Sequence, residues 1–138
     1  MYIAAYLVLI KDGKILLSKR KDTGYQDGNF SLVSGHFDGA ETAKQCIIRE
    51  AKEEANIKLT LDATNEVHVL HQLCPDKEYM GVFLKTDYWS GTIENLKPDK
   101  CDELTWFDLD NLPSNMVPEI SSALENIKNG IFYSEFGW

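Results

Sequence analysis

The stretch GHFDGAETAKQCIIREAKEEANI, residues 35–57, decides how this chain folds and where its chemistry lies. No Pro or Gly interrupts residues 41–55, where Ala, Glu, Lys, Gln, Arg and Ile predominate, and this predicts a helix of about four turns. Asn56 is the expected end of the helix, because Asn tolerates the left-handed conformation with which many helices terminate. A strand end and a glycine-containing loop, residues 34–40, precede the helix, so backbone groups there can approach a metal or a phosphate closely.

The predicted helix has an apolar face and an acidic sector. Four apolar side chains share one core-facing stripe at 100° per residue: Ile47, Ile48, Ala51 and Ala55. Glu50, Glu53 and Glu54 fall together in a different sector, where like charges at this spacing repel one another. They form either a solvated face, eased by pairs such as Arg49 with Glu53, or a site for a divalent cation, since Mg²⁺ prefers carboxylate oxygens. Composition alone does not choose between these interpretations.

Residues 35–57 also resemble the Nudix box. Its pattern is Gly, five residues, Glu, seven residues, Arg-Glu, an aliphatic residue, any residue, Glu-Glu, any residue, Gly and an aliphatic residue. The residues that carry the match are Gly35, Glu41, Arg49, Glu50, Ala51, Glu53, Glu54 and Ile57. Asn56 replaces the usual glycine after the helix, which should cost stability rather than chemistry. Upstream, Val33 and Ser34 replace the Pro-Gly or Pro-Ala that is common in the family. The chain is thus similar to the Nudix hydrolases, and features outside the box, given below, resemble their MutT-like branch.

The expected architecture is α/β (α+β). The length of 138 residues predicts a single domain over residues 1–138. Apolar and β-branched runs predict a β-hairpin of residues 3–10 and 15–18, further strands at 30–33, 57–61, 67–73, 80–85 and 104–107, and a second helix at 117–128. The resemblance implies that these elements form a Nudix-type α/β/α sandwich with a central mixed β-sheet.

The resemblance also implies an activity. Nudix proteins usually hydrolyse a nucleoside diphosphate linked to another group, with Mg²⁺ or Mn²⁺ neutralising phosphate oxygens and activating water. By analogy Glu50, Glu53 and Glu54 are the metal carboxylates, with the Gly35 carbonyl as a further ligand. Glu50 or Glu53 would accept the proton of the attacking water. Arg49 and Glu41 are expected to form an ion pair that holds loop and helix in register.

Two residues outside the box are further candidates. Family members often supply another acid from a downstream loop, and Glu103 stands at that place, with Asp102 as its competitor. Arg20 matches a phosphate-contacting position of MutT-like members, and a guanidinium suits a pair of phosphate oxygens. Both Glu103 and Arg20 are also consistent with ordinary surface residues.

The substrate is less well defined. The segment NLKPDKCDELTWF, residues 95–107, resembles the MutT-like branch that cleaves nucleoside triphosphates to monophosphate and pyrophosphate. The alternatives are ADP-ribose, a sugar nucleotide or another nucleoside diphosphate derivative, and a non-catalytic nucleotide-binding sensor. Candidate side chains for stacking on a base are Tyr25, Phe30, Phe37 and Trp106, of which Phe30 and Trp106 are expected in the core.

The charge of the chain limits which binding partners are expected. Lys plus Arg number 14 against 22 Asp plus Glu, which gives a net charge of −8. This charge disfavours a nucleic-acid polymer but permits a small phosphate substrate bridged by cations. Three widely spaced cysteines argue against a disulfide framework and favour the reducing cytoplasm. The apolar run near the N-terminus is too short to span a membrane. The tail IFYSEFGW, residues 131–138, would cover the edge of the core in a monomer or form a homodimer contact.

Overall fold

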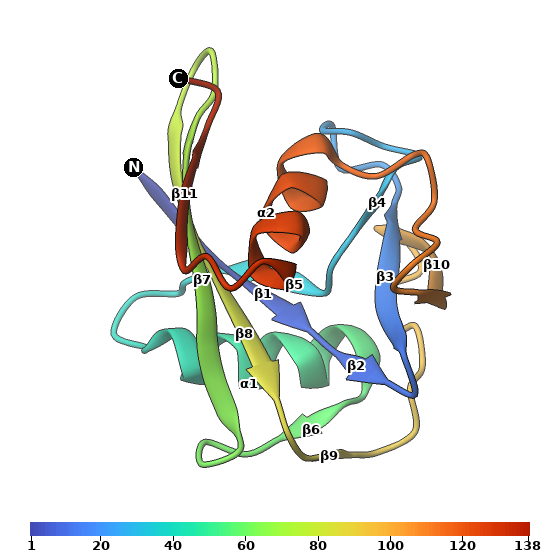
Figure 1. Ribbon diagram of the computed structural model, residues 1–138. Coiled ribbons are helices and arrows are strands. Elements are labelled where there is room, and N and C mark those ends of the chain that lie inside the picture. Colours follow the sequence, from blue (N-terminus) through green and yellow to red (C-terminus); the bar gives the residue numbers. More distant parts are fainter.

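The computed structural model describes residues 1–138, which form two helices and eleven strands (Figure 1). The helices are α1 (Ala43–Ala55) and α2 (Pro118–Lys128). The strands are β1 (Tyr2–Val8), β2 (Ile10–Lys11), β3 (Lys14–Arg20), β4 (Phe30–Ser31), β5 (Ser34–His36), β6 (Lys58–Leu59), β7 (Thr64–Leu73), β8 (Glu78–Thr86), β9 (Trp89–Ser90), β10 (Cys101–Asp108) and β11 (Tyr133–Phe136). Neither helix has the length and apolar character that crossing a membrane requires.

The largest sheet is mixed, with five strands in the order β11-β7-β8-β1-β5. In it β1 runs parallel to β8 and β11 parallel to β7, whereas the β7–β8 and β1–β5 pairs are antiparallel. A second sheet holds β10, β3 and β2, with β4 added to β3, and β6 pairs with β9 in a two-stranded ribbon. The predicted central mixed sheet is confirmed.

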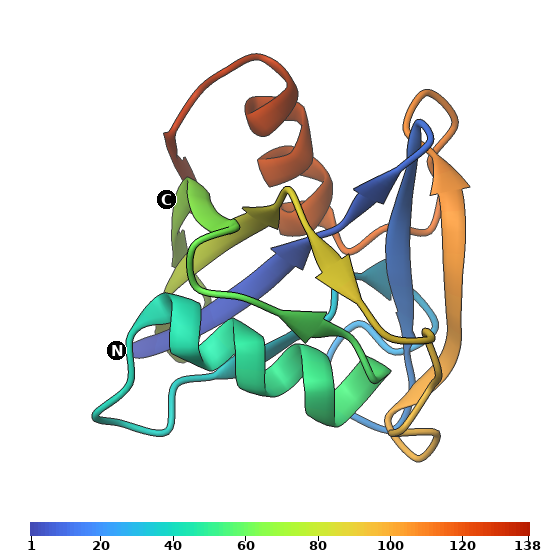
Figure 2. The ribbon, with the colours of Figure 1, turned by 90° about the horizontal axis from the view of Figure 1, so that it is seen from below.

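The two helices lie on opposite faces of the main sheet, as Figure 1 and Figure 2 show. Successive side chains of a strand point to opposite faces, so each central strand contributes to two cores. On β8, Leu84 packs in the cluster that contains the apolar stripe of α1, and Phe83 packs in the cluster that contains Ile120 and Ala123 of α2. These two cores confirm the α/β/α sandwich.

The predicted hairpin of residues 3–10 and 15–18 is wrong in its pairing. β1 pairs with β5 and β8, and β3 pairs with β10 and β4, so the two strands belong to different sheets. Only the two-residue strand β2 forms a hairpin with β3. The reason is burial: Ala5 and Val8 are buried on opposite faces of β1, which makes β1 a central strand whose two edges are taken by β5 and β8.

Both helices end close to the predicted positions, and local caps explain the differences. Residues 41–55 were the predicted span of α1, but the helix begins at Ala43 because Thr42 is its N-cap. The Thr42 hydroxyl accepts from the Gln45 backbone N–H (3.1 Å), and the Gln45 side chain accepts from the Thr42 N–H (2.9 Å), which completes a capping box. Glu41 therefore lies in the loop before the helix. Asn56 ends α1 in the left-handed conformation, with φ 57° and ψ 31°.

We expect Asn56→Ala to lower the free energy of unfolding by about 1–2 kcal/mol, because alanine disfavours positive φ and removes the bond from Asn56 Nδ2 to the Thr92 carbonyl (2.9 Å). Asn56→Gly keeps the backbone conformation and loses only that bond, so its cost should stay below about 1 kcal/mol. Urea unfolding of the two variants measures the difference. Equal losses would contradict the conformational argument.

The C-terminal tail lies on the edge of the main sheet. Within it, β11 pairs in parallel with β7, an element that the sequence analysis did not predict as a strand. Buried His68 of β7 anchors the connection, with Nδ1 2.8 Å from the Ile131 carbonyl and Nε2 2.7 Å from Ser134 Oγ. The Trp138 indole donates to the His71 carbonyl (3.1 Å). The backbone of the tail therefore pairs with its own chain, and Phe136 packs against the core on the α2 side, whereas Phe132, Tyr133 and Trp138 stay exposed. Both interpretations of the aromatic residues remain open.

Candidate active site

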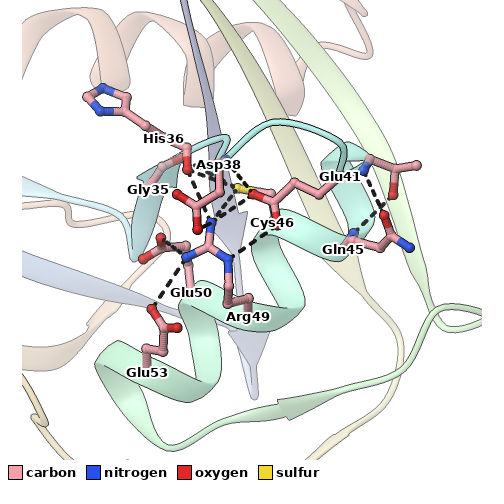
Figure 3. A network of polar contacts seen from close by, with 10 residues as sticks. Gly35, His36, Asp38, Glu41, Gln45, Cys46, Arg49, Glu50 and Glu53 are labelled. Atoms are coloured by element: carbon pink, nitrogen blue, oxygen red, sulfur yellow. Dashed lines mark hydrogen bonds and ion pairs between the residues drawn. The ribbon is translucent and has the colours of Figure 1, made fainter.

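The candidate residues between Gly35 and Glu54 lie on β5, on the loop that follows it and on α1, and most of them are drawn in Figure 3. β5 is the edge strand of the main sheet and pairs with β1, with Gly35 opposite Ala5. The loop turns back through Gly39 and Ala40, whose φ angles are 80° and 53°, and Thr42 then starts the helix. This course packs α1 against β5 and brings the acidic sector of the helix to the backbone of the strand.

The Glu50 carboxyl group occupies the place that a side chain on Gly35 would take. A Cβ atom on Gly35 would overlap Cδ, Oε1 and Cγ of Glu50. The carboxylate therefore lies directly against the backbone of β5. Burial raises the pKa of Glu50, and the Arg49 guanidinium opposes part of that rise. Carboxylate and backbone carbonyl oxygens are the kinds of ligand that Mg²⁺ prefers, and both kinds are present on β5 and α1.

Arg49 connects the loop to the helix (Figure 3). Its Nη2 and Nε donate to the two carboxylate oxygens of Glu41, at 2.8 and 3.2 Å, and Nη2 also donates to the His36 carbonyl (3.2 Å). Its Nη1 contacts Glu50 Oε1 at 2.6 Å and Glu53 Oε2 at 3.4 Å. The hydrogen bonds from Arg49 are the main reason that the pKa of Glu41 falls to about 2. The pair therefore stays charged over the whole neutral range, and loop and helix are tied together by it.

Glu54 is partly buried and faces Ser34, whose backbone N–H donates to its Oε1 (3.3 Å). Burial raises the pKa of Glu54 to about 7, and the negative charge of Glu50 adds to the rise. In this arrangement the three carboxylates do not converge as a ligand set, because Arg49 holds Glu50 and Glu53 while Glu54 turns to Ser34. The chemistry of the donors nevertheless matches a divalent cation, which would offset their mutual repulsion.

The raised pKa of Glu54 predicts that the metal-free protein loses stability as the pH rises. The folded chain holds this proton up to pH about 7, whereas the unfolded chain releases it near the ordinary value of 4.5. Protonated Glu54 therefore contributes up to about 3 kcal/mol to the free energy of unfolding. This contribution is fully present below the pKa of the unfolded chain and is lost as the pH rises through the pKa of the folded chain. Urea unfolding in EDTA between about pH 5 and pH 8 measures this loss. The free energy of unfolding of Glu54→Gln should rise relative to that of the wild type as the pH increases. A pH-independent difference between the two would contradict the assignment.

The structure places Glu103 and Arg20 on the second sheet. Glu103 is exposed on β10, opposite Lys19 of β3, and does not contact the acids of α1 through a hydrogen bond. Arg20 ends β3, and its guanidinium donates to the Tyr25 carbonyl (2.6 Å) and to Thr23 Oγ1 (2.9 Å). Arg20 is thus bound to the loop of residues 21–29 and lines a cavity, whereas Glu103 lies outside that cavity.

A cavity of about 330 Å³ opens beside β5. Its wall is gathered from β1, β3, β4, β5, β7, β8, the start of α2 and the loop of residues 21–29. Ser34 and Gly35 belong both to this wall and to the acidic site, since Ser34 binds Glu54 and Gly35 contacts Glu50. A ligand in the cavity therefore lies next to the backbone that the helix acids contact.

Most aromatic candidates from the sequence lie elsewhere. Of Tyr25, Phe30, Phe37 and Trp106, only Tyr25 lines the cavity. Phe30 is buried in the core with its ring 4.9 Å from that of Phe107, and Trp106 packs against the core on the α1 side. Tyr6 and Tyr79, which no sequence pattern marked as candidates, line the cavity instead.

Sequence reasoning also missed Gln72 and Glu119, two polar side chains of the cavity wall. A signal for each was present. Glu119 precedes Ile120 and stands four residues before Ala123, so an acid interrupts the apolar stripe of α2. Gln72 follows buried Leu70 at the strand period of two, so a polar residue stands at an inward position.

Comparisons with known proteins agree with this geometry. A family model described as NUDIX domain matches residues 1–127. The crystal structure of a MutT NUDIX hydrolase from Burkholderia pseudomallei is 27% identical, with a TM-score of 0.82 over 90% of this chain and 95% of that one. A MutT protein from Methanosarcina mazei, 16% identical, shares the fold with a TM-score of 0.79 over 93% of each chain.

Two curated relatives have different names. An ADP-ribose pyrophosphatase from Methanocaldococcus jannaschii is 30% identical over 106 residues, which are 77% of this chain and 61% of the relative. An NAD-capped RNA hydrolase NudC from Vibrio atlanticus is 31% identical over 122 residues, 87% of this chain and 42% of the relative. The chain thus spans less than two thirds of the length of either.

Proposed function

Because the chain belongs to the Nudix hydrolase family, we propose that it is a metal-dependent pyrophosphohydrolase that cleaves a nucleoside triphosphate to a nucleoside monophosphate and pyrophosphate. The position of Ser34 and Gly35 supports this most strongly. These two residues contact Glu54 and Glu50 on one side and line the cavity on the other. A nucleotide bound in the cavity would therefore bring its phosphates to the acids of α1.

Glu50, Glu53 and Glu54 would hold Mg²⁺ or Mn²⁺, with the Gly35 carbonyl as a further ligand and Glu103 as an additional acid from β10. When bound, the cation neutralises phosphate oxygens and lowers the pKa of a coordinated water. Arg49 keeps two contacts with Glu41, so it can release Glu50 and Glu53 without losing its place. The Arg49–Glu41 pair would then hold the loop and the helix in register while the ligands are in use.

The proton of the attacking water would go to Glu50 or Glu53. Both lie within reach of Arg49, but Glu50 is packed against Gly35, whereas the Glu53 side chain is 51% exposed and has more room to move. Arg20 would bind phosphate oxygens after it exchanges its contacts with Thr23 and the Tyr25 carbonyl. Positioning and charge stabilisation are the main contributions that phosphoryl transfer needs from a protein.

A substrate panel tests the proposal. The purified chain is incubated with Mg²⁺ and with nucleoside triphosphates, ADP-ribose and a sugar nucleotide, and the products are separated by ion exchange. Nucleoside monophosphate together with pyrophosphate is the expected result, and EDTA should abolish it. Two phosphate monoesters formed from ADP-ribose or a sugar nucleotide, with the triphosphates left intact, would overturn the triphosphate assignment.

The second candidate function, hydrolysis of ADP-ribose or another nucleoside diphosphate derivative, is supported by the 30% identical relative named as an ADP-ribose pyrophosphatase. The third is a nucleotide-binding sensor without turnover. Saturable nucleotide binding with no product of any kind would support the sensor. The three intact carboxylates argue against it, because a protein that only binds has less need of all three.

A further inference from the structure

The main sheet ends in an open edge at β11. This strand is the outermost one of the sheet and pairs with β7 on one side only (Figure 1). The Phe132 carbonyl, directly before β11, accepts a hydrogen bond from the Val69 N–H of β7 (2.7 Å). Since the backbone groups of successive strand residues point in opposite directions, those of Tyr133 and Glu135 point away from β7. Backbone groups exposed in this way pair readily with another strand.

Exposed apolar side chains border this edge. Ile131, Phe132, Tyr133 and Trp138 are 44%, 55%, 46% and 65% exposed. Single exposed apolar residues are common on protein surfaces, but here four large ones fall within residues 131–138. Open backbone groups and apolar side chains thus occur on the same segment, and together they are typical of an edge that binds an additional strand.

The polar side chains of β11 indicate which strand fits. The Tyr133 hydroxyl donates to Glu135 Oε2 (3.1 Å), and both side chains are exposed. Ser134 lies between them and points to the other face of the sheet, where its Oγ is 2.7 Å from Nε2 of buried His68. A donor and an acceptor placed on either side of a small residue are complementary to the same strand turned through 180°.

We propose that two copies of this chain form a homodimer by antiparallel pairing of β11 about a two-fold axis at Ser134. In this register Tyr133 of each copy lies opposite Glu135 of the other, and each such pair exchanges two backbone hydrogen bonds. The Tyr133 hydroxyl then donates to Glu135 of the second copy instead of to its own. Phe132 lies opposite Phe136 of the second copy as an apolar cross-strand pair. The main sheets of the two copies join into one continuous sheet.

The residues of the tail disfavour the neighbouring registers. A shift of the pairing by one residue would place outward backbone groups opposite groups that already bond to β7. A shift of two residues moves the axis to Glu135 or to Tyr133. With the axis at Glu135, two carboxylates lie directly opposite each other and repel. With the axis at Tyr133, the Glu135 carboxylate lies opposite the apolar side chain of Ile131. The axis at Ser134 avoids both arrangements.

Sedimentation velocity of the full chain over a range of concentrations tests the dimer. The wild type should show a monomer–dimer equilibrium. Glu135→Pro removes an outward N–H from each copy and keeps the pairing with β7, so it should raise the Kd of the dimer by about tenfold or more. Glu135→Ala keeps that N–H and should change the Kd by less than about threefold. A wild type that stays monomeric up to about 100 μM, or a Kd that Glu135→Pro leaves unchanged, overturns the proposal.

Disulfide formation tests the register without the proline variant. Ser134→Cys brings two thiols together at the axis, where opposite Cα atoms lie about 4.5 Å apart, within the span of a disulfide. Glu135→Cys places its thiols on residues whose Cα atoms are more than about 7 Å apart. Treatment with diamide followed by non-reducing electrophoresis should give a covalent dimer of Ser134→Cys, with little of it in Glu135→Cys or the wild type. Cross-linking of Glu135→Cys that equals or exceeds that of Ser134→Cys overturns the pairing about Ser134.

Discussion

Glu53→Gln should lower kcat by about 10²-fold or more, because the substitution keeps the size of the side chain and removes the negative charge that would hold the cation or accept the proton of water. Glu53 lies on the acidic sector of α1, and its side chain is half exposed. Removal of its charge should therefore not unfold the chain, and the unfolding midpoint should stay near that of the wild type.

Single-turnover and steady-state rates with a nucleoside triphosphate measure the effect of Glu53→Gln. Glu66→Gln, an exposed acid on β7, is the matched control and should keep wild-type turnover. Near wild-type turnover in Glu53→Gln at an unchanged affinity for Mg²⁺ would show that Glu53 has neither of the roles proposed for it.

Gly35→Ala should also lower turnover by about 10²-fold or more, for a steric reason. The new methyl group would overlap the carboxyl group of Glu50, so either Glu50 or β5 has to move. If Glu50 and the Gly35 carbonyl are metal ligands as proposed, a displacement of either by about 1 Å is enough to cost this much. Overpacking should in addition lower the free energy of unfolding by about 1–3 kcal/mol.

A double-variant cycle separates the two effects of Gly35→Ala. Glu50→Ala alone removes the carboxylate that the new methyl group would strike. If the overlap is the cause, Gly35→Ala should cost little stability in the Glu50→Ala background, while turnover stays low in both. A loss of stability that is the same in the presence and absence of the Glu50 side chain would contradict the steric explanation.

Features that depend on neighbours in the sequence were predictable. The helix that ends at Asn56 follows from local propensity, and its apolar stripe and acidic sector follow from the helical period. The helix starts two residues later than predicted for a local reason as well, since Thr42 and Gln45 form a capping box. The pattern from Gly35 to Ile57 could thus indicate the candidate site before the structure was known.

Features that depend on distant partners were not predictable. The sequences of β1 and β3 have the apolar pattern that is typical of a hairpin. However, β1 is buried on both faces as a central strand of the main sheet, and β3 pairs in another sheet. β11 is short and becomes a strand only through its parallel pairing with β7. Tyr25 and Glu119 are 94 positions apart in the chain, and only the folded structure shows their hydrogen bond. Spacing along the sequence carries no information about such contacts.

The candidate site therefore consists of two parts with different origins. Apart from Glu103, every proposed cation ligand comes from one strand and one helix, between Gly35 and Glu54. The wall around Gln72 and Glu119 is assembled from β7, α2 and other distant segments. Substitutions in the cavity wall can thus change which ligand is bound while the proposed cation ligands on β5 and α1 stay the same. Ser34 and Gly35 are the exception, since they serve both parts, and mutational drift should tolerate the least change at these two positions.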